Sequence, residues 1–229
     1  YLAITFLETP LLALILAILL KSVGASGVYS FQENDNIPTY FFISVLVALF
    51  VGMTQSAEEI IHDRRALQRE AYLHLSRQSY LLAKVSILFA IAAVQMLFYV
   101  AVGNWILEVR EMFWPFWFML FSVSCFANML GLNISATFNE AVSVYILVPL
   151  MLIPQILLSG AMVSFSKLHP AITDVDKVPL VGDMMASRWA YEGLAVYQYK
   201  QNRYEKRFFD LNQEISACKY KSTWIDELQ

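Results

Sequence analysis

The sequence predicts an all-α membrane protein, a polytopic bundle of helices. Of its 229 residues, 58% are hydrophobic and only 15% are charged. Soluble domains average about 45–50% apolar and about 25% charged residues, so this chain is too apolar for that class. The mean hydropathy is +0.53, and several apolar runs approach the ~20 residues that a helix needs to cross a bilayer.

Five apolar runs are predicted to be membrane spans. They cover residues 2–20, 39–55, 81–107, 113–138 and 141–163. With their connections they form a predicted transmembrane bundle at residues 1–163. The fourth run opens with Phe113, Trp114, Phe116, Trp117 and Phe118, which is typical of an aromatic belt at a membrane surface.

Two spans carry residues that are unusual in hydrocarbon. Glu8 and Pro10 interrupt the first run, and a carboxylate in the bilayer centre costs at least about 2.5 kcal/mol on insertion scales. Glu8 either lies at the interface, close to the start of its helix, or serves a proton or substrate path. The fifth run contains Pro149 and Pro154, which free backbone carbonyls that neighbours or water must satisfy.

The long charged segment between the second and third spans is residues 57–80. Its apolar residues recur near helical spacing and arginines and acidic residues fill most other positions, which predicts an amphipathic helix. Such a helix lies at the interface rather than across the membrane. Arg64, Arg65, Arg69 and Arg77 place it on the cytoplasmic side, together with the start of the chain. It either presents a charged surface to a partner or only joins two spans.

The tail, residues 164–229, is then predicted to lie outside, and a sixth span is expected beyond the C-terminus. An amphipathic helix is predicted at about residues 186–201, and it could dip into the outer leaflet. Five of its residues fall on one helical face: Trp189, Gly193, Val196, Tyr197 and Lys200. The chain begins with Tyr1 and shows no signal-peptide pattern, so we expect it to be part of a longer polypeptide.

The sequence contains no catalytic motif that we can recognise. It lacks a phosphate-binding loop, a G-x-S-x-G elbow and an H-E-x-x-H pair. Cys125 and Cys218 are expected at different depths, so we expect neither a disulfide nor a metal site. No basic patch with interleaved aromatics indicates nucleic acid.

Three motifs resemble the permease domains of type II ABC exporters of the G-subfamily, especially bacterial half-transporters with ATPase and permease on one polypeptide. The first is the ordered set Asp63-Arg64-Arg65, Arg69-Glu70, Ser79-Tyr80 and Lys84. The second is Ser159-Gly160, and the third runs from Arg188 to Leu194 as RWAYEGL.

The resemblance implies that the charged segment contacts a nucleotide-binding domain, on the same polypeptide or on a separate chain. The implied coupling residues are Asp63, Arg64, Arg65, Arg69 and Glu70. That domain would bind ATP and Mg and make the complete transporter an ATPase, whereas no cofactor is expected in this chain. The tail would be an external loop with a re-entrant helix.

The resemblance also implies a homodimer with the substrate path between the second and fifth spans of two copies. The path residues would be Phe42, Phe50, Val51, Pro149, Ile153 and Ile156. The outer gate would be Ala161 and Met162, where family members carry a pair of leucines.

The function expected from this resemblance is the permease portion of an ATP-driven exporter in the cell (inner) membrane, which moves a hydrophobic or amphipathic substrate by alternating access. Two other classes stay open. One is a non-transporting scaffold or sensory protein whose charged helix docks a cytoplasmic partner. The other is an ion-coupled carrier that uses Glu8 and Glu140.

Overall fold

The computed structural model describes residues 2–21, 34, 36–70, 76–109, 112–138, 141–162 and 180–198, and near the C-terminus residues 211, 214–216 and 218. These residues form helices and no strand, so the all-α prediction is confirmed for the described chain. The helices are α1 (Leu2–Leu20), α2 (Ile37–Ser56), α3 (Glu59–Glu70), α4 (Arg77–Leu107), α5 (Phe113–Thr137), α6 (Ala141–Leu157), α7 (Leu180–Asp183) and α8 (Ala186–Val196).

Three of these helical stretches are long and apolar enough to cross a membrane. They are Ile37–Arg64, Gln78–Leu107 and Phe113–Thr137, which contain α2, α4 and α5. The first and fifth predicted spans correspond to shorter apolar helices, Phe6–Leu20 and Val142–Leu157. The described chain therefore contains three helices of spanning length and two shorter apolar ones.

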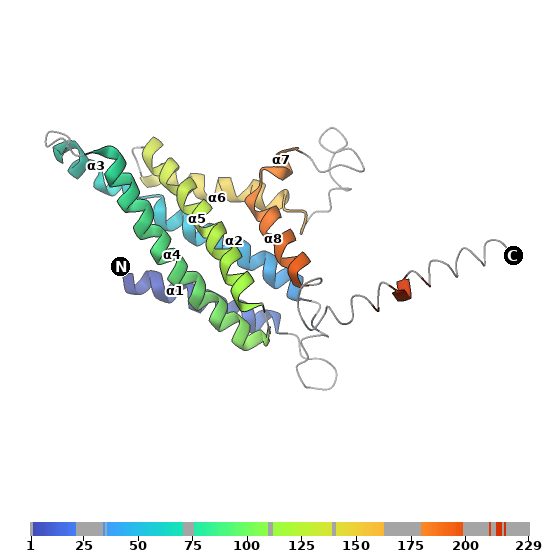
Figure 1. Cartoon of the computed structure of the whole chain (residues 1–229). Coiled ribbons are helices and arrows are strands. Elements are labelled where there is room, and N and C mark those ends of the chain that lie inside the picture. The colour runs from blue at the N-terminus through green and yellow to red at the C-terminus, as the bar shows by residue number, and fades with distance from the viewer. Residues whose placement is uncertain are drawn as a thin grey trace.

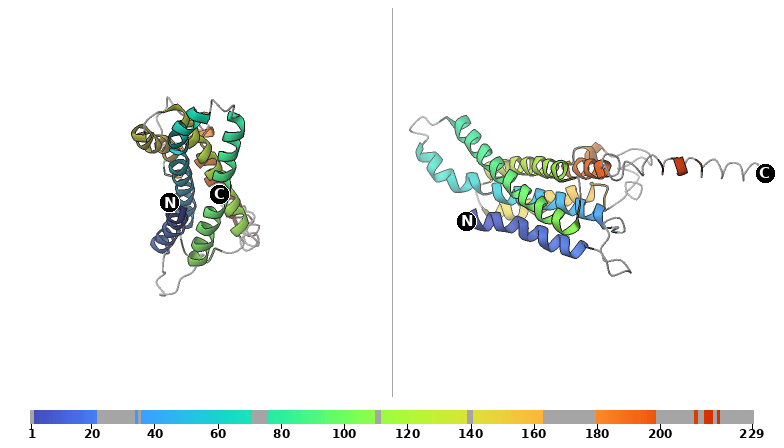
Figure 2. Two further views of the ribbon diagram at one scale, coloured as in Figure 1. Left: turned by 90° about the vertical axis from the view of Figure 1, so that its left-hand side faces the viewer. Right: turned by 60° about the horizontal axis from the view of Figure 1, so that its bottom comes forward.

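The helices α2 and α5 form the centre of the bundle. The helices α1 and α4 pack against each other on one side of this pair, and α6 and α8 pack on it elsewhere. Figure 1 shows α3 at one end of the bundle, beside the start of α4, and α7 and α8 toward the other end. The second view in Figure 2 shows the same order along the bundle, with the start of α1 at the end where α3 lies.

Small residues let α2 and α5 approach closely. A Cβ atom on Gly52 would lie 2.8 Å from the carbonyl oxygen of Ser124 and 2.8 Å from the Cβ of Ala127. A Cβ on Gly131 would collide with the hydroxyl of Ser56 and lie 2.8 Å from the carbonyl oxygen of Met53. Close backbone approach at small residues is a common way for helices to associate in membranes, because lipid supplies no hydrophobic drive.

The buried face of α2 also packs aromatic residues near its start. The rings of Tyr40, Phe41 and Phe116 lie with their centroids 5.3–5.9 Å apart in tilted or edge-on pairs, an arrangement that adds stability beyond area burial. The predicted belt at the start of α5 is half-exposed: Trp114 is largely exposed, while the Trp117 indole donates to the carbonyl of Ala93 at 3.0 Å.

Asn34 ties the end of α1 to the start of α2. Its side-chain amide donates to the carbonyl of Leu20 at 3.0 Å, and its side-chain oxygen accepts from the backbone N–H of Asn36 at 3.0 Å. Pro38 follows in the first turn of α2, where its missing N–H costs no helical bond.

Three predicted boundaries differ from the structure. The charged segment 57–80 is not one helix, because α3 ends at Glu70 and Arg77–Tyr80 already belong to α4, capped by the hydroxyl of Ser76. The fifth apolar run stops being helical at Leu157 and turns at Gly160, where φ is +75°. The helix predicted at 186–201 ends its α-helical part at Val196, and residues 199–201 lie outside the described part of the chain.

Candidate coupling site and substrate path

The start of α3 is capped by a residue of α5. The buried hydroxyl of Ser135 accepts from the backbone N–H groups of Ile60 and Ile61, at 3.0 and 3.2 Å. The first N–H groups of any helix have no partner within it. Ser135 therefore does for α3 what an N-cap side chain of its own would do, and it fixes the start of α3 to the end of α5.

Arg64 makes the reverse connection. Its guanidinium donates to the carbonyls of Phe138 at 3.1 Å and Ala136 at 3.4 Å, at the end of α5. The last carbonyls of a helix are unpaired within it and carry partial negative charge, so a cation there is favourable. The helices α3 and α5 therefore cap each other, and Arg64 supplies half of that contact.

A second contact fastens α3 to α4. Lys84 Nζ lies 2.7 Å from Asp63 and 2.6 Å from Glu59, and the Tyr80 hydroxyl donates to Asp63 at 2.8 Å. These bonds fasten α3 to the first turns of α4.

The other coupling residues lie on α3 at positions whose side chains are outside the described part. Arg65, Arg69 and Glu70 belong to the last two turns of α3. Of the five predicted coupling residues, the structure brings Asp63 and Arg64 into contacts within this chain. The charged residues available to a docking partner would then be Arg65, Arg69 and Glu70, which follow Asp63 and Arg64 in α3.

The α6–α8 contact was not anticipated from the sequence. The backbone N–H of Ser187 donates to the Gln155 side-chain oxygen at 3.1 Å, and the Ser187 hydroxyl donates to the Gln155 carbonyl at 2.6 Å. Both residues are buried. Because Ser187 lies in the first turn of α8 and Gln155 in the last turn of α6, one residue pair satisfies unpaired groups at two helix ends.

One face of α8 is buried against the bundle. Ser187, Ala190 and Leu194 are buried, while Trp189 and Val196 are exposed. Tyr191 packs edge-on against Phe42 of α2, with ring centroids 5.8 Å apart. Of the residues predicted to share one helical face, Trp189 and Val196 are exposed, whereas Tyr197 packs against the buried core. That this helix dips into the outer leaflet stays a prediction.

The predicted path residues fall into two groups. Phe42 and Val51 are buried in the bundle, Phe42 against α8. Phe50, Pro149 and Ile153 are exposed on α2 and α6, and Ile156 is partly buried.

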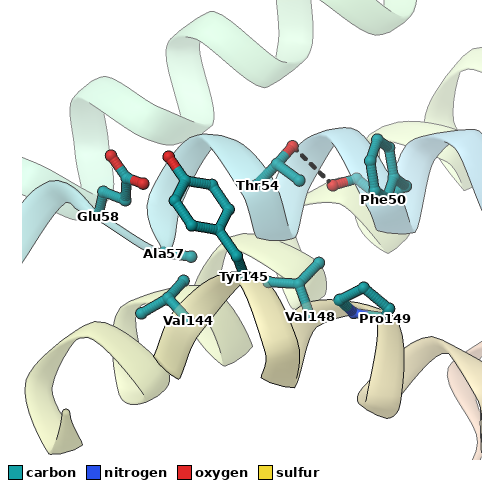
Figure 3. Close-up of a pocket in the computed structure, with 8 residues that line it drawn as sticks. All are labelled: Phe50, Thr54, Ala57, Glu58, Val144, Tyr145, Val148 and Pro149. Carbon is teal, nitrogen blue, oxygen red and sulfur yellow. Dashed lines mark hydrogen bonds between the residues drawn. The ribbon is translucent and has the colours of Figure 1, made fainter. Parts of the chain in front are cut away.

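One pocket brings two of the exposed path residues, Phe50 and Pro149, together. It has a volume of about 260 Å³ and lies between the last turns of α2 and the start of α6. Its walls include Phe50 and Pro149, together with Thr54, Ala57, Glu58, Val144, Tyr145 and Val148. Figure 3 shows Glu58 at one end of this row of side chains and Phe50 and Pro149 at the other.

The predicted gate residues follow α6 rather than belonging to it. The Ser159 hydroxyl donates to the carbonyl of Ile156 at 2.8 Å and accepts from the N–H of Ala161 at 3.3 Å, which shapes the turn. Ala161 is partly buried and Met162 is 69% exposed. Glu8, the candidate of the ion-coupled hypothesis, is exposed on α1, and Glu140 lies outside the described residues.

No group of three or more His, Cys, Asp or Glu side chains with metal-site geometry occurs among the described residues. Residues 1–180 match the family model described as ABC-2 type transporter. The chain belongs to the ABC-2 type transporter family. A comparison with curated proteins gave no match.

The match shows that the chain is the membrane domain of an ABC-2 type transporter. It covers all of α1–α6, including the α3 contacts and the pocket, and ends where α7 begins. Proteins of this family normally pair with an ATPase partner. The α8 helix, fastened to α6 through Gln155, lies beyond the match.

Proposed function

We propose that this ABC-2 membrane domain is the permease portion of an ATP-driven exporter of the G-subfamily type, located in the cell (inner) membrane. Two copies form a homodimer, and a nucleotide-binding domain that holds ATP and Mg docks on α3. The substrate is hydrophobic or amphipathic and passes between α2 and α6 of the two copies. The nucleotide-binding domain is coupled through Asp63, Arg64, Arg65, Arg69 and Glu70. The path is lined by Phe42, Phe50, Val51, Pro149, Ile153 and Ile156, and its outer gate is formed by Ala161 and Met162.

The observation that carries the proposal is the double attachment of α3. A nucleotide-driven change can shift a transporter between states only through contacts that differ between those states. A partner that displaces α3 would act on α5 through Ser135 and Arg64 and on α4 through Lys84. Only a two-residue turn separates α3 from α2. A force on α3 would thus reach the wall of the path directly.

The test is a charge reversal on the turns of α3 beyond these contacts. Arg69→Glu combined with Glu70→Arg should abolish substrate-stimulated ATPase activity in the complete transporter and leave its amount in the membrane nearly unchanged. Exposed ion pairs contribute only about 0–1 kcal/mol each, so the fold should tolerate the change. ATPase activity and transport are measured in proteoliposomes.

The matched control exchanges the same two charges in the tail, as Arg203→Glu with Glu205→Arg. This control should retain substrate stimulation. Unchanged stimulation in the α3 variant would contradict docking at this helix. If hydrolysis continued while transport stopped, the scaffold and carrier alternatives would both be excluded.

A further inference from the structure

The pocket between α2 and α6 is chemically asymmetric. Its apolar walls come from Phe50, Ala57, Val144, Val148 and Pro149. The Thr54 hydroxyl already donates to the carbonyls of Phe50 and Val51, at 2.9 and 3.1 Å. Glu58 is the acidic group among the lining residues and lies at one end of the pocket (Figure 3). The cavity therefore suits a molecule that is apolar along most of its length and polar at one end.

The two oxygens of the Glu58 carboxylate have different surroundings. Oε2 lies 3.1 Å from Nε2 of His62, one turn further along the chain. Oε1 is shielded from solvent and has no hydrogen-bond partner among the residues that the structure describes. A shielded carboxylate oxygen without a donor is costly, because it has lost water and gained nothing in exchange. A ligand that brings a donor, and above all a cation, would relieve that cost.

The nearby described cations are engaged elsewhere. Arg64 donates to the end of α5, and Lys84 is paired with Glu59 and Asp63. None of the eight residues that line the pocket is a lysine or an arginine. The charge of the lining residues at the polar end of the pocket is therefore negative, and the imidazole of His62, which contacts Glu58, is exposed.

We infer that Glu58 makes this pocket selective for amphiphilic monocations. The protonated amine of the ligand donates to Oε1 of Glu58, and its apolar body lies between Phe50 on α2 and Val148 and Pro149 on α6. The aromatic rings of Phe50 and Tyr145 line the same cavity and can attract a cation through their faces. The inference rests on the proposed function, since it names the class of substrate for that path.

The first experiment compares two probes of nearly equal shape, 4-phenylbutylamine and 4-phenylbutan-1-ol, on the purified full-length transporter. At pH 7.4 the amine is protonated, because the pKa of an alkylamine such as lysine is about 10.4. A hydrogen bond to a charged group should favour the amine about tenfold or more. Equal affinity for the two probes in the unmodified protein would overturn the inference without any variant.

The second experiment removes the charge. Glu58→Gln should lower the affinity for the amine about tenfold and leave that for the alcohol unchanged. Glu8→Gln makes the same chemical change on the exposed face of α1 and should leave both affinities unchanged. Retention of the amine preference in Glu58→Gln would overturn the inference.

The two hypotheses fail in distinguishable ways. If the amine binds through Glu58 but does not stimulate the ATPase or cross the membrane, the proposed function fails and the selectivity stands. If transport is observed but depends neither on the charge of the probe nor on Glu58, the selectivity fails and the proposed function stands.

Discussion

The helices α3 and α8 both begin against the last turn of another helix, but they are held differently. At the α3–α5 contact, the Ser135 hydroxyl accepts hydrogen bonds from two backbone N–H groups at the start of α3. About one turn further along α3, Arg64 donates two hydrogen bonds to carbonyls at the end of α5. A separate set of charged contacts then fastens α3 to α4. At the α6–α8 contact, both bonds join the same two neutral residues, Gln155 and Ser187.

The difference concerns how many directions of movement each contact blocks. Bonds at two places along α3 oppose rotation as well as separation, so we expect α3 to move together with α4 and α5. A single residue pair opposes separation but permits rotation about itself. We therefore expect α8 to change its angle to α6 more easily than α3 changes its angle to α5.

The largest effect is expected in cysteine labelling, which tests whether α3 and the tail after α8 lie on opposite sides of the membrane. In a background with Cys125→Ala and Cys218→Ser, a cysteine at Gln68 of α3 should react with an impermeant thiol reagent only after permeabilisation. The native Cys218, which is exposed, should react in intact cells when Cys125 alone is replaced. Labelling of position 68 in intact cells would reverse the orientation and remove the coupling argument.

The next largest effect is expected on protein stability, when a methyl group is added to a glycine of α5 or of α8. Gly131→Ala should destabilise the protein by about 3 kcal/mol or more, because the added methyl meets the hydroxyl of Ser56 and the backbone of Met53. Gly193→Ala on α8 is the matched control. Its methyl meets only the flexible end of Met119, at 2.7 Å, so its cost should be below about 1 kcal/mol. Thermal unfolding in detergent measures both, and equal losses would show that α2 and α5 are not closely packed.

The smallest and most specific effect compares the two serines. Ser135→Ala and Ser187→Ala should each cost about 1 kcal/mol, the usual value for a lost cap or hydrogen bond. Only Ser135→Ala should weaken the coupling of ATP hydrolysis to transport, because it loosens α3. Ser187→Ala should increase proteolysis or hydrogen exchange at α8 and leave coupling intact. Equal coupling in both variants would mean that the Ser135 cap only contributes to stability.

The spans were the most predictable part of the molecule. Apolar runs locate α1, α2, α4 and α5 to within a few residues, because membrane-length helices are specified locally by composition. The end of α6 was missed, since the run stays apolar through Val163 while Ser159 and Gly160 form a turn. A glycine near the end of a helix is a recognisable stop signal, and here it marks the end of α6 better than hydropathy does.

The contacts of α3 were predictable only in part. Arg64 follows Ile60 by four residues, so it shares the apolar face of the helix, and this spacing could have placed it against the bundle. Lys84 and Asp63 lie 21 residues apart and meet because α3 and α4 lie against each other there. Gln155 and Ser187 meet across 32 residues. No local pattern specifies such pairs, because they depend on the geometry of the whole bundle.

The glycine contacts between α2 and α5 have a mechanical consequence. Where two backbones are in contact, no side chain can change rotamer to accommodate a shift of one helix against the other. We therefore expect α2 and α5 to move together as a rigid body. Bulkier residues separate α2 from α6, among them Phe50 and Val148 on the walls of the pocket, and these can repack. Relative movement of helices in this domain should therefore occur mainly between α2 and α6. A substrate would open a passage there, while α2 and α5 stay in contact throughout the cycle.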